Sequence, residues 1–276
     1  TNRNVLQYVD NYAHGLQIKP GDHYALLFSC AVNAGAHVIF STLLNGATLC
    51  VYDVRRRGLA DLPAWLVEQQ ITLYASVPTL FRDWARALAS HCRFPALRCL
   101  MMIGEPVYAR DLELFRSLPA PGCTLINRLG STETGSILWH FCGRDEPASG
   151  VHVPVGRPVH GNEILLLDES GRTVPPEQIG EIVVRSRYLS PGYWRRQEVT
   201  ARAFESDPVD PDLRLRAGHE REAAGHAGGH RGAEASGRSA HRGLTRPATH
   251  LPGRHPPGAR TGGQLAVRSR AMAVWP

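Results

Sequence analysis

Lysine is nearly absent from this sequence, which holds a single one, Lys19, among its 276 residues. Long apolar segments are absent too: no run of 18 apolar residues occurs, so no segment has the length of a transmembrane helix. The first ten residues lack the basic and apolar segments of a secretory signal and have no initiator methionine. These absences predict a cytoplasmic protein without a membrane partner, present here as a fragment of a longer chain.

Several site-forming patterns are missing as well. The six cysteines include no Cys-x-x-Cys pair, which favours reduced thiols in a core over a zinc site or a disulfide framework. Neither the Gly-x-Gly-x-x-Gly pattern of dinucleotide-binding folds nor the Gly-x-Ser-x-Gly pattern of α/β hydrolases occurs. Those two enzyme classes therefore have no support in the sequence.

The composition of the chain changes at about Arg214. Residues 214–276 contain eleven arginines and three glutamates, so they carry a charge of +8, whereas the rest of the chain carries −2. This segment is rich in Arg, Gly, Ala, His and Pro and has no Ile, Phe or Tyr, which predicts a disordered tail. Trp275 is its single aromatic residue of the kind that stacks on bases, so we expect no nucleic-acid partner. Out-of-frame translation of a GC-rich gene, with a frame shift near Leu215, is one hypothesis for this composition.

Before the tail, short apolar segments alternate with amphipathic ones. We expect strands at 23–28, 47–52, 71–77, 97–103 and 124–127, with helices between them, such as the one that Leu80, Trp84 and Leu88 indicate by their spacing. Such alternation is typical of an α/β fold with a mainly parallel sheet covered by helices, here over residues 1–150. Segments 163–168 and 180–187 indicate antiparallel strands, so residues 151–213 are expected to form a smaller β-rich subdomain.

The segment 127–135, Asn-Arg-Leu-Gly-Ser-Thr-Glu-Thr-Gly, is the most informative motif. It directly follows an expected strand, and loops at the carboxyl ends of parallel strands commonly bind ligands. Gly130 permits close backbone packing, the nearby hydroxyls can donate to phosphate oxygens, and Glu133 offers a carboxylate to Mg²⁺. A polar turn in which Glu133 caps a helix explains the same residues equally well.

The order of motifs resembles the adenylate-forming superfamily, which includes acyl-CoA synthetases, luciferases and the adenylation domains of nonribosomal peptide synthetases. The resemblance covers residues 1–213 and, with segment 39–53, looks closest to the peptide-synthetase domains. Its motifs are an Ile-Gly-Glu-Pro turn at 103–106, Leu-Gly-Ser-Thr-Glu at 129–133, Val-Gly-Arg-Pro at 155–158, a Gly-Glu strand at 180–184 and a Gly-Tyr turn at 189–194.

This resemblance implies a ligase that uses ATP to convert a carboxylic acid, whether an amino, aryl or other acyl acid, into an acyl adenylate. The acyl group would then pass to the phosphopantetheine thiol of a carrier protein. The resemblance implies Thr132 and Glu133 as catalytic residues and Glu133 as the Mg²⁺ ligand. The residues that it implies for ATP binding are Gly104, Glu105, Asn127, Leu129, Gly130, Ser131 and Thr132.

The sequence departs from the family pattern at several places. The family's phosphate-binding loop would precede residue 1, and Lys19 resembles a loop residue rather than the family's catalytic lysine. Residues 217–219 (Ala-Gly-His) stand roughly where the family has a ribose-binding Thr-Gly-Asp, and Leu129 replaces an aromatic residue that stacks on adenine. An inactive remnant with weak or no nucleotide binding is therefore the alternative.

The resemblance also bears on the substrate. Counting back from Leu-Leu-Asn-Gly-Ala at 43–47 places Asn33 where amino-acid-activating domains have an aspartate that pairs with the substrate ammonium. An amide cannot supply that charge, so an aryl or other acyl acid is favoured over an α-amino acid. Asn33 could instead cap a helix. The same counting predicts six more residues of the acid pocket: Ala34, His37, Met101, Ile103, Ser136 and Ile137.

Overall fold

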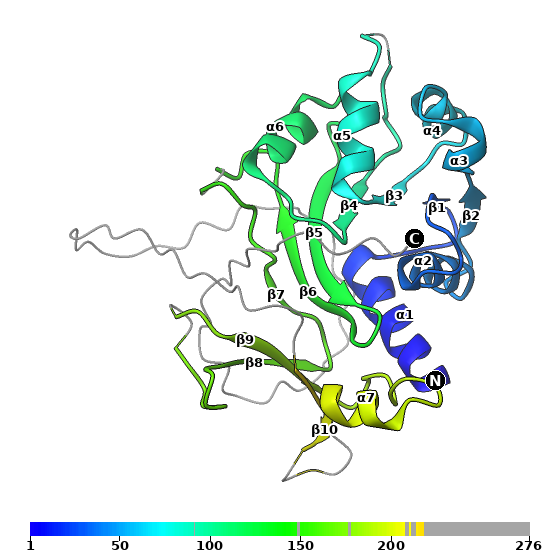
Figure 1. Cartoon of the computed structure of the whole chain (residues 1–276). Helices are drawn as coiled ribbons and strands as arrows, with labels where there is room; N and C mark the ends of the chain where they lie inside the picture. The colour runs from blue at the N-terminus through cyan, green and yellow to red at the C-terminus, as the bar shows by residue number, and fades with distance from the viewer. Residues whose placement is uncertain (91, 148–149, 176–177, 208–209, 211–213, 218–276) are drawn as a thin grey trace, which may run out of the picture.

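Two sheets organise the chain (Figure 1). The computed structural model describes residues 1–217 apart from 91, 148–149, 176–177, 208–209 and 211–213. The first sheet has seven strands in the order β2-β1-β3-β4-β5-β6-β7, and the second has four in the order β10-β11-β9-β8. The α/β class and the β-rich part that follows it are confirmed.

The first sheet is parallel over its first five strands, as expected. These are β1 (His23–Leu26), β2 (Thr48–Val51), β3 (Leu73–Ser76), β4 (Cys99–Ile103) and β5 (Thr124–Ser131). β6 (Gly135–Cys142) runs antiparallel to β5, and β7 (Arg157–Pro158) runs antiparallel to β6. The division of the chain near residue 150 stays a prediction, although the first sheet includes β7, beyond that residue.

Helices cover both faces of this sheet, and alternate strand residues therefore enter different cores. In β4, Leu100 and Met102 belong to the cluster that includes Trp84, whereas Met101 and Ile103 belong to the cluster that includes Tyr12. The first face is covered by α4 (Leu62–Glu68), α5 (Pro78–Arg86) and α6 (Ala109–Ser117), and the second by α1 (Asn2–Leu16) and α2 (Asn33–Leu43). The short α3 (Val54–Arg57) follows β2.

The second sheet is antiparallel and packs against the first through β6. It comprises β8 (Asn162–Leu167), β9 (Glu181–Ser186), β10 (Phe204–Ser206) and β11 (Arg214–Ala217), and α7 (Gln197–Ala203) leads into β10. Leu166, Ile182 and Val184 pack with Ile137 and Leu138 of β6 in a third apolar cluster. The two sheets therefore share a core.

The start of the predicted tail needs a correction. Residues 214–217 form β11, which pairs with β9 and β10. Strand pairing uses backbone groups, and the alternation Arg-Leu-Arg-Ala has the period of a strand, which the composition of the whole segment concealed. The remainder of the predicted tail, including Gly218 and His219, lies outside the described residues.

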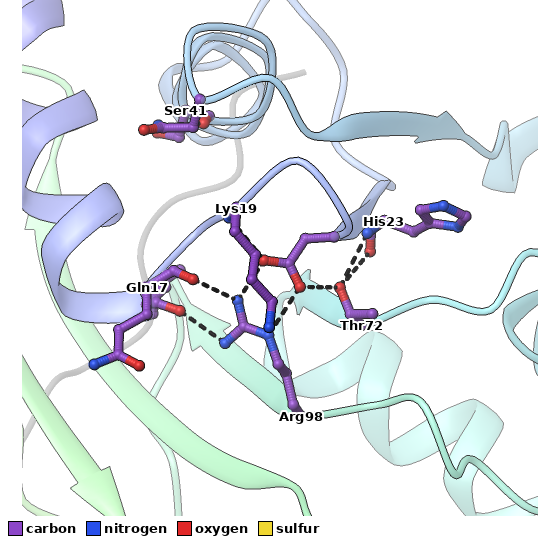
Figure 2. A network of polar contacts seen from close by, with 9 residues as sticks. Gln17, Lys19, His23, Ser41, Thr72 and Arg98 are labelled. Atoms are coloured by element: carbon purple, nitrogen blue, oxygen red, sulfur yellow. Dashed lines mark hydrogen bonds and ion pairs between the residues drawn. The ribbon is translucent and has the colours of Figure 1, made fainter. Parts of the chain in front are cut away.

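A polar network joins the α1–β1 connection to the amino ends of β3 and β4 (Figure 2). Asp22 is 1% exposed and accepts hydrogen bonds from Arg98 Nε (2.9 Å), Arg98 Nη2 (2.6 Å) and Thr72 Oγ1 (2.9 Å). Arg98 also donates to the carbonyl oxygens of Leu16 and Gln17. Burial opposes ionisation of Asp22, but the hydrogen bonds from Arg98, the backbone N–H of Lys19 and Thr72 hold its pKa below the usual value.

All six cysteines are free thiols, and four of them are buried. Burial raises the pKa of Cys99 and of Cys142 to about 12, so these thiols stay protonated and unreactive, as expected for core cysteines. In the part of the chain that the structure describes, no helix combines the length and apolar character needed to cross a bilayer.

Candidate functional site

The motif at 127–135 forms a β-hairpin instead of a loop that leaves the sheet. β5 continues to Ser131, residues 132–134 make the turn, and β6 returns from Gly135. The predicted strand end at Asn127 was therefore wrong, and so was the alternative in which Glu133 caps a helix. The apolar run after Gly135 supplies a partner strand, which lets the polar residues of the motif continue the hydrogen-bonded ladder.

Glycines allow the two strands to approach closely at the turn. A Cβ atom on Gly130 would lie 2.1 Å from the carbonyl oxygen of Gly135, so any side chain would force the strands apart. Gly135 has a φ of 69°, in the left-handed region that glycine adopts readily. The strand register shifts between Leu129 and Gly130. The close backbone packing expected at Gly130 is present.

The turn itself presents hydroxyl and carboxylate groups. Ser131 Oγ and Thr134 Oγ1 lie 3.0 Å apart, and Thr132 is exposed. Glu133 Oε1 accepts a hydrogen bond of 2.6 Å from Tyr193 Oη, and the Glu133 carbonyl oxygen accepts one of 2.9 Å from the backbone N–H of Ser190. These contacts fix the turn against the segment 189–194, which the sequence analysis identified as a separate motif.

A cavity of about 170 Å³ opens beside this turn. Its walls are the start of α1, Asn33 and His37 of α2, residues 132–135 of the hairpin, and Tyr188, Ser190 and Pro191. The cavity therefore brings together the hydroxyl-bearing turn and two residues predicted to bind the acid.

Asn33 contacts the hairpin instead of capping α2. The N-cap residue is Val32, and Asn33 is the first helical residue. Its Nδ2 donates a 3.2 Å hydrogen bond to the carbonyl oxygen of Ser131, at the end of β5. The capping alternative was wrong because the strand end offers Asn33 a carbonyl acceptor that the sequence does not reveal.

A buried polar cluster lies behind the cavity. Arg128, on β5, is 5% exposed and donates from Nε to Ser136 Oγ (2.7 Å) and from Nη2 to His37 Nδ1 (3.0 Å). Ser136 Oγ also accepts from the indole N–H of Trp139. Since His37 Nδ1 is an acceptor, the neutral ring has its proton on Nε2. Burial, and secondly the charge of Arg128, hold the pKa of His37 well below its usual value of 6.5, so the ring is neutral at pH 7.

The seven residues predicted for the acid pocket divide into three groups. Asn33 and His37 line the cavity. Ala34, Met101, Ile103 and Ser136 lie near the same face of the first sheet, either in α2 or in strands that α1 and α2 cover, without lining the cavity. Ile137 packs in the third apolar cluster, because successive residues of a strand point to opposite faces.

The residues predicted to bind ATP lie in or directly after two neighbouring strands, β4 and β5. Gly104 and Glu105 directly follow β4, whose last residue pairs with Arg128 of β5. Glu105 accepts hydrogen bonds from the backbone N–H and the hydroxyl of Thr79. Thr132 alone among these residues lines the cavity, together with Glu133.

Two members of the ATP-binding set have structural contacts. Asn127 is 4% exposed and donates from Nδ2 to the carbonyl oxygens of Val153 (3.0 Å) and Pro154 (2.9 Å), so it anchors the chain that leads to β7. Leu129 packs against the third apolar cluster. Their predicted contacts with a nucleotide stay predictions.

Sequence analysis assigned no role to Arg128. The available signal was a charged residue inside the apolar segment Thr-Leu-Ile-Asn-Arg-Leu, where a buried cation needs compensation. Tyr193, which orients Glu133, was noted only as part of a turn motif.

Comparison of the sequence with known protein families identifies the family of this chain. The sequence profile of the AMP-binding enzymes matches residues 1–194. The chain belongs to the AMP-binding enzyme family. The resemblance noted in the sequence is thereby confirmed, and the match includes the hairpin, both cavity-lining residues of α2 and Tyr193.

Curated relatives of this AMP-binding chain include peptide synthetases. It is 30% identical over 186 residues to the L-proline–[L-prolyl-carrier protein] ligase of Streptomyces coelicolor, covering 66% of this chain and 35% of the ligase. It is 27% identical over 214 residues to surfactin synthase subunit 2 of Bacillus subtilis, covering 76% of this chain and 6% of that protein. The chain thus spans only about a third or less of the length of these relatives.

Solved structures share the fold of this AMP-binding chain. CmiS6 superposes with a TM-score of 0.70 at 26% identity, over 79% of this chain and 53% of that protein. The Vibrio cholerae adenylation domain AlmE, solved in complex with glycyl-adenosine-5'-phosphate, has a TM-score of 0.68 at 20% identity, over 79% of this chain and 41% of AlmE. At that identity the second likeness shows the fold alone.

Proposed function

We propose that this chain forms part of an AMP-forming ligase that activates a carboxylic acid with ATP for transfer to the thiol of a carrier protein. The observation that supports this proposal best is the shared cavity: the turn with Thr132, Glu133 and Thr134 and the α2 residues Asn33 and His37 line one space. The hydroxyl and carboxylate groups of the turn, which suit a phosphate with Mg²⁺, thus lie beside the α2 residues predicted to bind the carboxylic acid. A relative named as a prolyl-carrier protein ligase supports the carrier-bound product.

The donor set of the turn fits a phosphate with its metal ion. The turn contributes one carboxylate, from Glu133, and two hydroxyls, from Thr132 and Thr134, to the lining of the cavity, and hard oxygen donors are what Mg²⁺ and phosphate groups require. Glu133 would hold Mg²⁺, which would neutralise phosphate charge. Tyr193 would keep the Glu133 carboxylate oriented through its 2.6 Å hydrogen bond.

The size of the cavity limits what it can enclose. Its 170 Å³ falls below the range of about 300–1,000 Å³ that is typical of pockets for drug-sized ligands. We therefore assign to it the acid and the reacting phosphate, with the rest of the nucleotide extending toward Gly104 and Glu105 at the end of β4.

In the proposed reaction, a carboxylate oxygen bonds to the α-phosphorus of ATP while the bond to the pyrophosphate oxygen breaks. A carrier thiol then attacks the acyl carbon and releases AMP. Thr132, which borders the cavity, would donate a hydrogen bond to a phosphate oxygen, and positioning of this kind accounts for much of phosphoryl-transfer catalysis. We place the enzyme in the cytoplasm, where ATP is available. We infer that its substrate is an aryl or other acyl acid, because the amide of Asn33 cannot neutralise the ammonium group of an α-amino acid.

The alternative is an inactive remnant with weak or no nucleotide binding. The single lysine, Lys19, precedes β1 at the amino ends of the parallel strands, whereas the cavity adjoins the turn beyond the carboxyl end of β5. Lys19 therefore does not border the cavity.

ATP–pyrophosphate exchange over a panel of carboxylic acids tests the proposal. We expect exchange with at least one acid, and we expect Glu133→Ala to weaken ATP binding in the presence of Mg²⁺ by about tenfold, the loss of one charge-assisted contact. Glu68→Ala, which removes an exposed carboxylate at the end of α4, is the matched control and should not change ATP affinity. Failure of the wild-type chain both to bind ATP and to catalyse exchange would establish the inactive alternative.

A further inference from the structure

Arg128 is a buried cation with no carboxylate partner in the described part of the chain. Its guanidinium contacts are Ser136 Oγ and His37 Nδ1, both uncharged, and the ring of Tyr12, whose centroid lies 5.9 Å from the guanidinium carbon. Burial of an uncompensated charge is strongly unfavourable, and such charges in proteins are normally paired. Among the described residues, no anion neutralises the buried charge of Arg128.

The neutral ring of His37 connects Arg128 to the cavity. Its Nδ1 accepts from Arg128, so its Nε2–H is a donor, and this buried atom has no hydrogen-bond partner among the residues that the structure describes. A hydrogen bond from a guanidinium to one ring nitrogen polarises the ring and makes the other N–H a stronger donor. A negatively charged acceptor would accept the hydrogen bond of His37 Nε2–H and would also neutralise the charge of Arg128.

The environment of the ring determines where that acceptor can lie. Tyr8 lies against the imidazole with ring centroids 3.9 Å apart and planes tilted by 36°, and Tyr12 lies 5.7 Å away in an edge-on arrangement. On the Nε2 side lies Gly135, where an added Cβ atom would sit 3.8 Å from Nε2. Both His37 and Gly135 line the cavity, so a ligand there would approach the buried Nε2 from the side of Gly135, which has no side chain.

Building on the function proposed above, we propose that the acid bound in this cavity has a second carboxylate, which accepts the Nε2–H hydrogen bond of His37 and neutralises the charge of Arg128. The substrate class is then dicarboxylic acids. One carboxylate lies at the turn formed by Thr132 and Glu133, and the other lies against His37. An ammonium group at this end would be repelled by Arg128, in agreement with the uncharged Asn33 beside it.

Binding measurements without ATP test this inference separately from the ligase reaction. Isothermal titration of the full chain with succinate, glutarate and adipate is compared with the monocarboxylates of equal chain length. We expect at least one dicarboxylate to bind about tenfold or more tightly than its monocarboxylate counterpart, the gain of one charge-assisted hydrogen bond. Arg128→Met should abolish that preference. Arg185→Met is the control, because it removes the same charge from β9, where Arg185 pairs with Glu163 and Asp207.

Equal affinity for both acid series, or a preference that survives Arg128→Met, would overturn the inference while leaving the ligase proposal to its own exchange assay. A measurement on the wild-type chain covers the case in which Arg128→Met does not fold. In ¹⁵N spectra of the imidazoles, with the His37 signals assigned through His37→Gln, the preferred dicarboxylate should shift the Nε2 resonance of His37. No shift at saturating dicarboxylate would contradict the proposal equally.

Discussion

Two arginines at opposite ends of the first sheet have opposite electrostatic surroundings. Arg98, just before β4, donates to the buried carboxylate of Asp22, and this pair joins the α1–β1 connection to the sheet. Arg128 lies on β5 beside the last residue of β4, and so at the opposite end of the sheet from Arg98. It has only neutral partners among the described residues and lies behind the cavity. The chain therefore compensates charge where an ion pair stabilises the fold, and leaves it uncompensated where we infer that a ligand binds.

The largest expected effect comes from breaking the compensated pair. Arg98→Met should lower the free energy of unfolding by about 3 kcal/mol, because it leaves the 1%-exposed carboxylate of Asp22 buried without its cation. Urea unfolding followed by circular dichroism measures this loss. The double variant Asp22→Asn/Arg98→Met should recover part of the stability, and a double variant as unstable as Arg98→Met would show that the charge of Asp22 is not the cause.

The Asp22–Arg98 pair should also affect how the free energy of unfolding changes at acid pH. The folded pKa of Asp22 lies below its usual value of 3.8, so its contribution to stability is fully present above pH 3.8 and declines as the pH falls through the lower folded pKa. In Arg98→Met the folded pKa should rise toward or above 3.8, so the unfolded chain no longer binds more protons than the folded one and the variant should lose less stability than the wild type as the pH falls below 3.8. Acid unfolding curves of the two proteins that coincide after correction for their stability at pH 7 would contradict this.

A smaller effect concerns the histidine beside the unpaired arginine. The pKa of His37 is well below 6.5 in the folded state, so the unfolded chain binds a proton that the folded chain does not as the pH falls below 6.5. The contribution of His37 to stability is thus complete above about pH 6.5 and should decrease as the pH falls below that value. Comparison of wild type with His37→Gln isolates this from the other histidines, and identical pH slopes in the two proteins would refute it.

The smallest change in stability is expected at the unpaired arginine itself. Arg128→Met removes hydrogen bonds to Ser136 and His37 but also removes a buried charge without a counterion, so the two effects should cancel to within about 1 kcal/mol. Chemical unfolding at pH 7 measures the difference. A loss as large as that of Arg98→Met would mean that both arginines serve stability and would remove the contrast between the two ends of the sheet.

The sequence predicted the parallel sheet well because its strands are buried on both faces. The strand β4, Cys-Leu-Met-Met-Ile at 99–103, is continuously apolar, and that pattern depends little on distant contacts. The hairpin was harder to predict, since Arg128 and Ser131 resemble loop residues until β6 is known to pair with them. Asn33 was undecided for a similar reason: its acceptor is the carbonyl oxygen of Ser131, 98 residues away.

The unpaired state of Arg128 was also beyond sequence analysis. The sequence shows a charge within an apolar segment, but whether a carboxylate from another element reaches it depends on how the elements pack. Asp22 lies 76 residues before Arg98 and still pairs with it, whereas no described acidic residue pairs with Arg128.

The hydrogen bond between Glu133 and Tyr193 joins residues 60 positions apart and spans the whole of β8 and β9. During synthesis from the amino end, the strands of the first sheet emerge before this partner exists, because contacts between distant residues form only once the intervening chain is available. The Glu133 carboxylate would acquire its orientation only after the Gly-Tyr turn leaves the ribosome. Nascent chains that end before residue 188 would therefore form the parallel sheet while the turn that faces the cavity still lacked its fixed geometry.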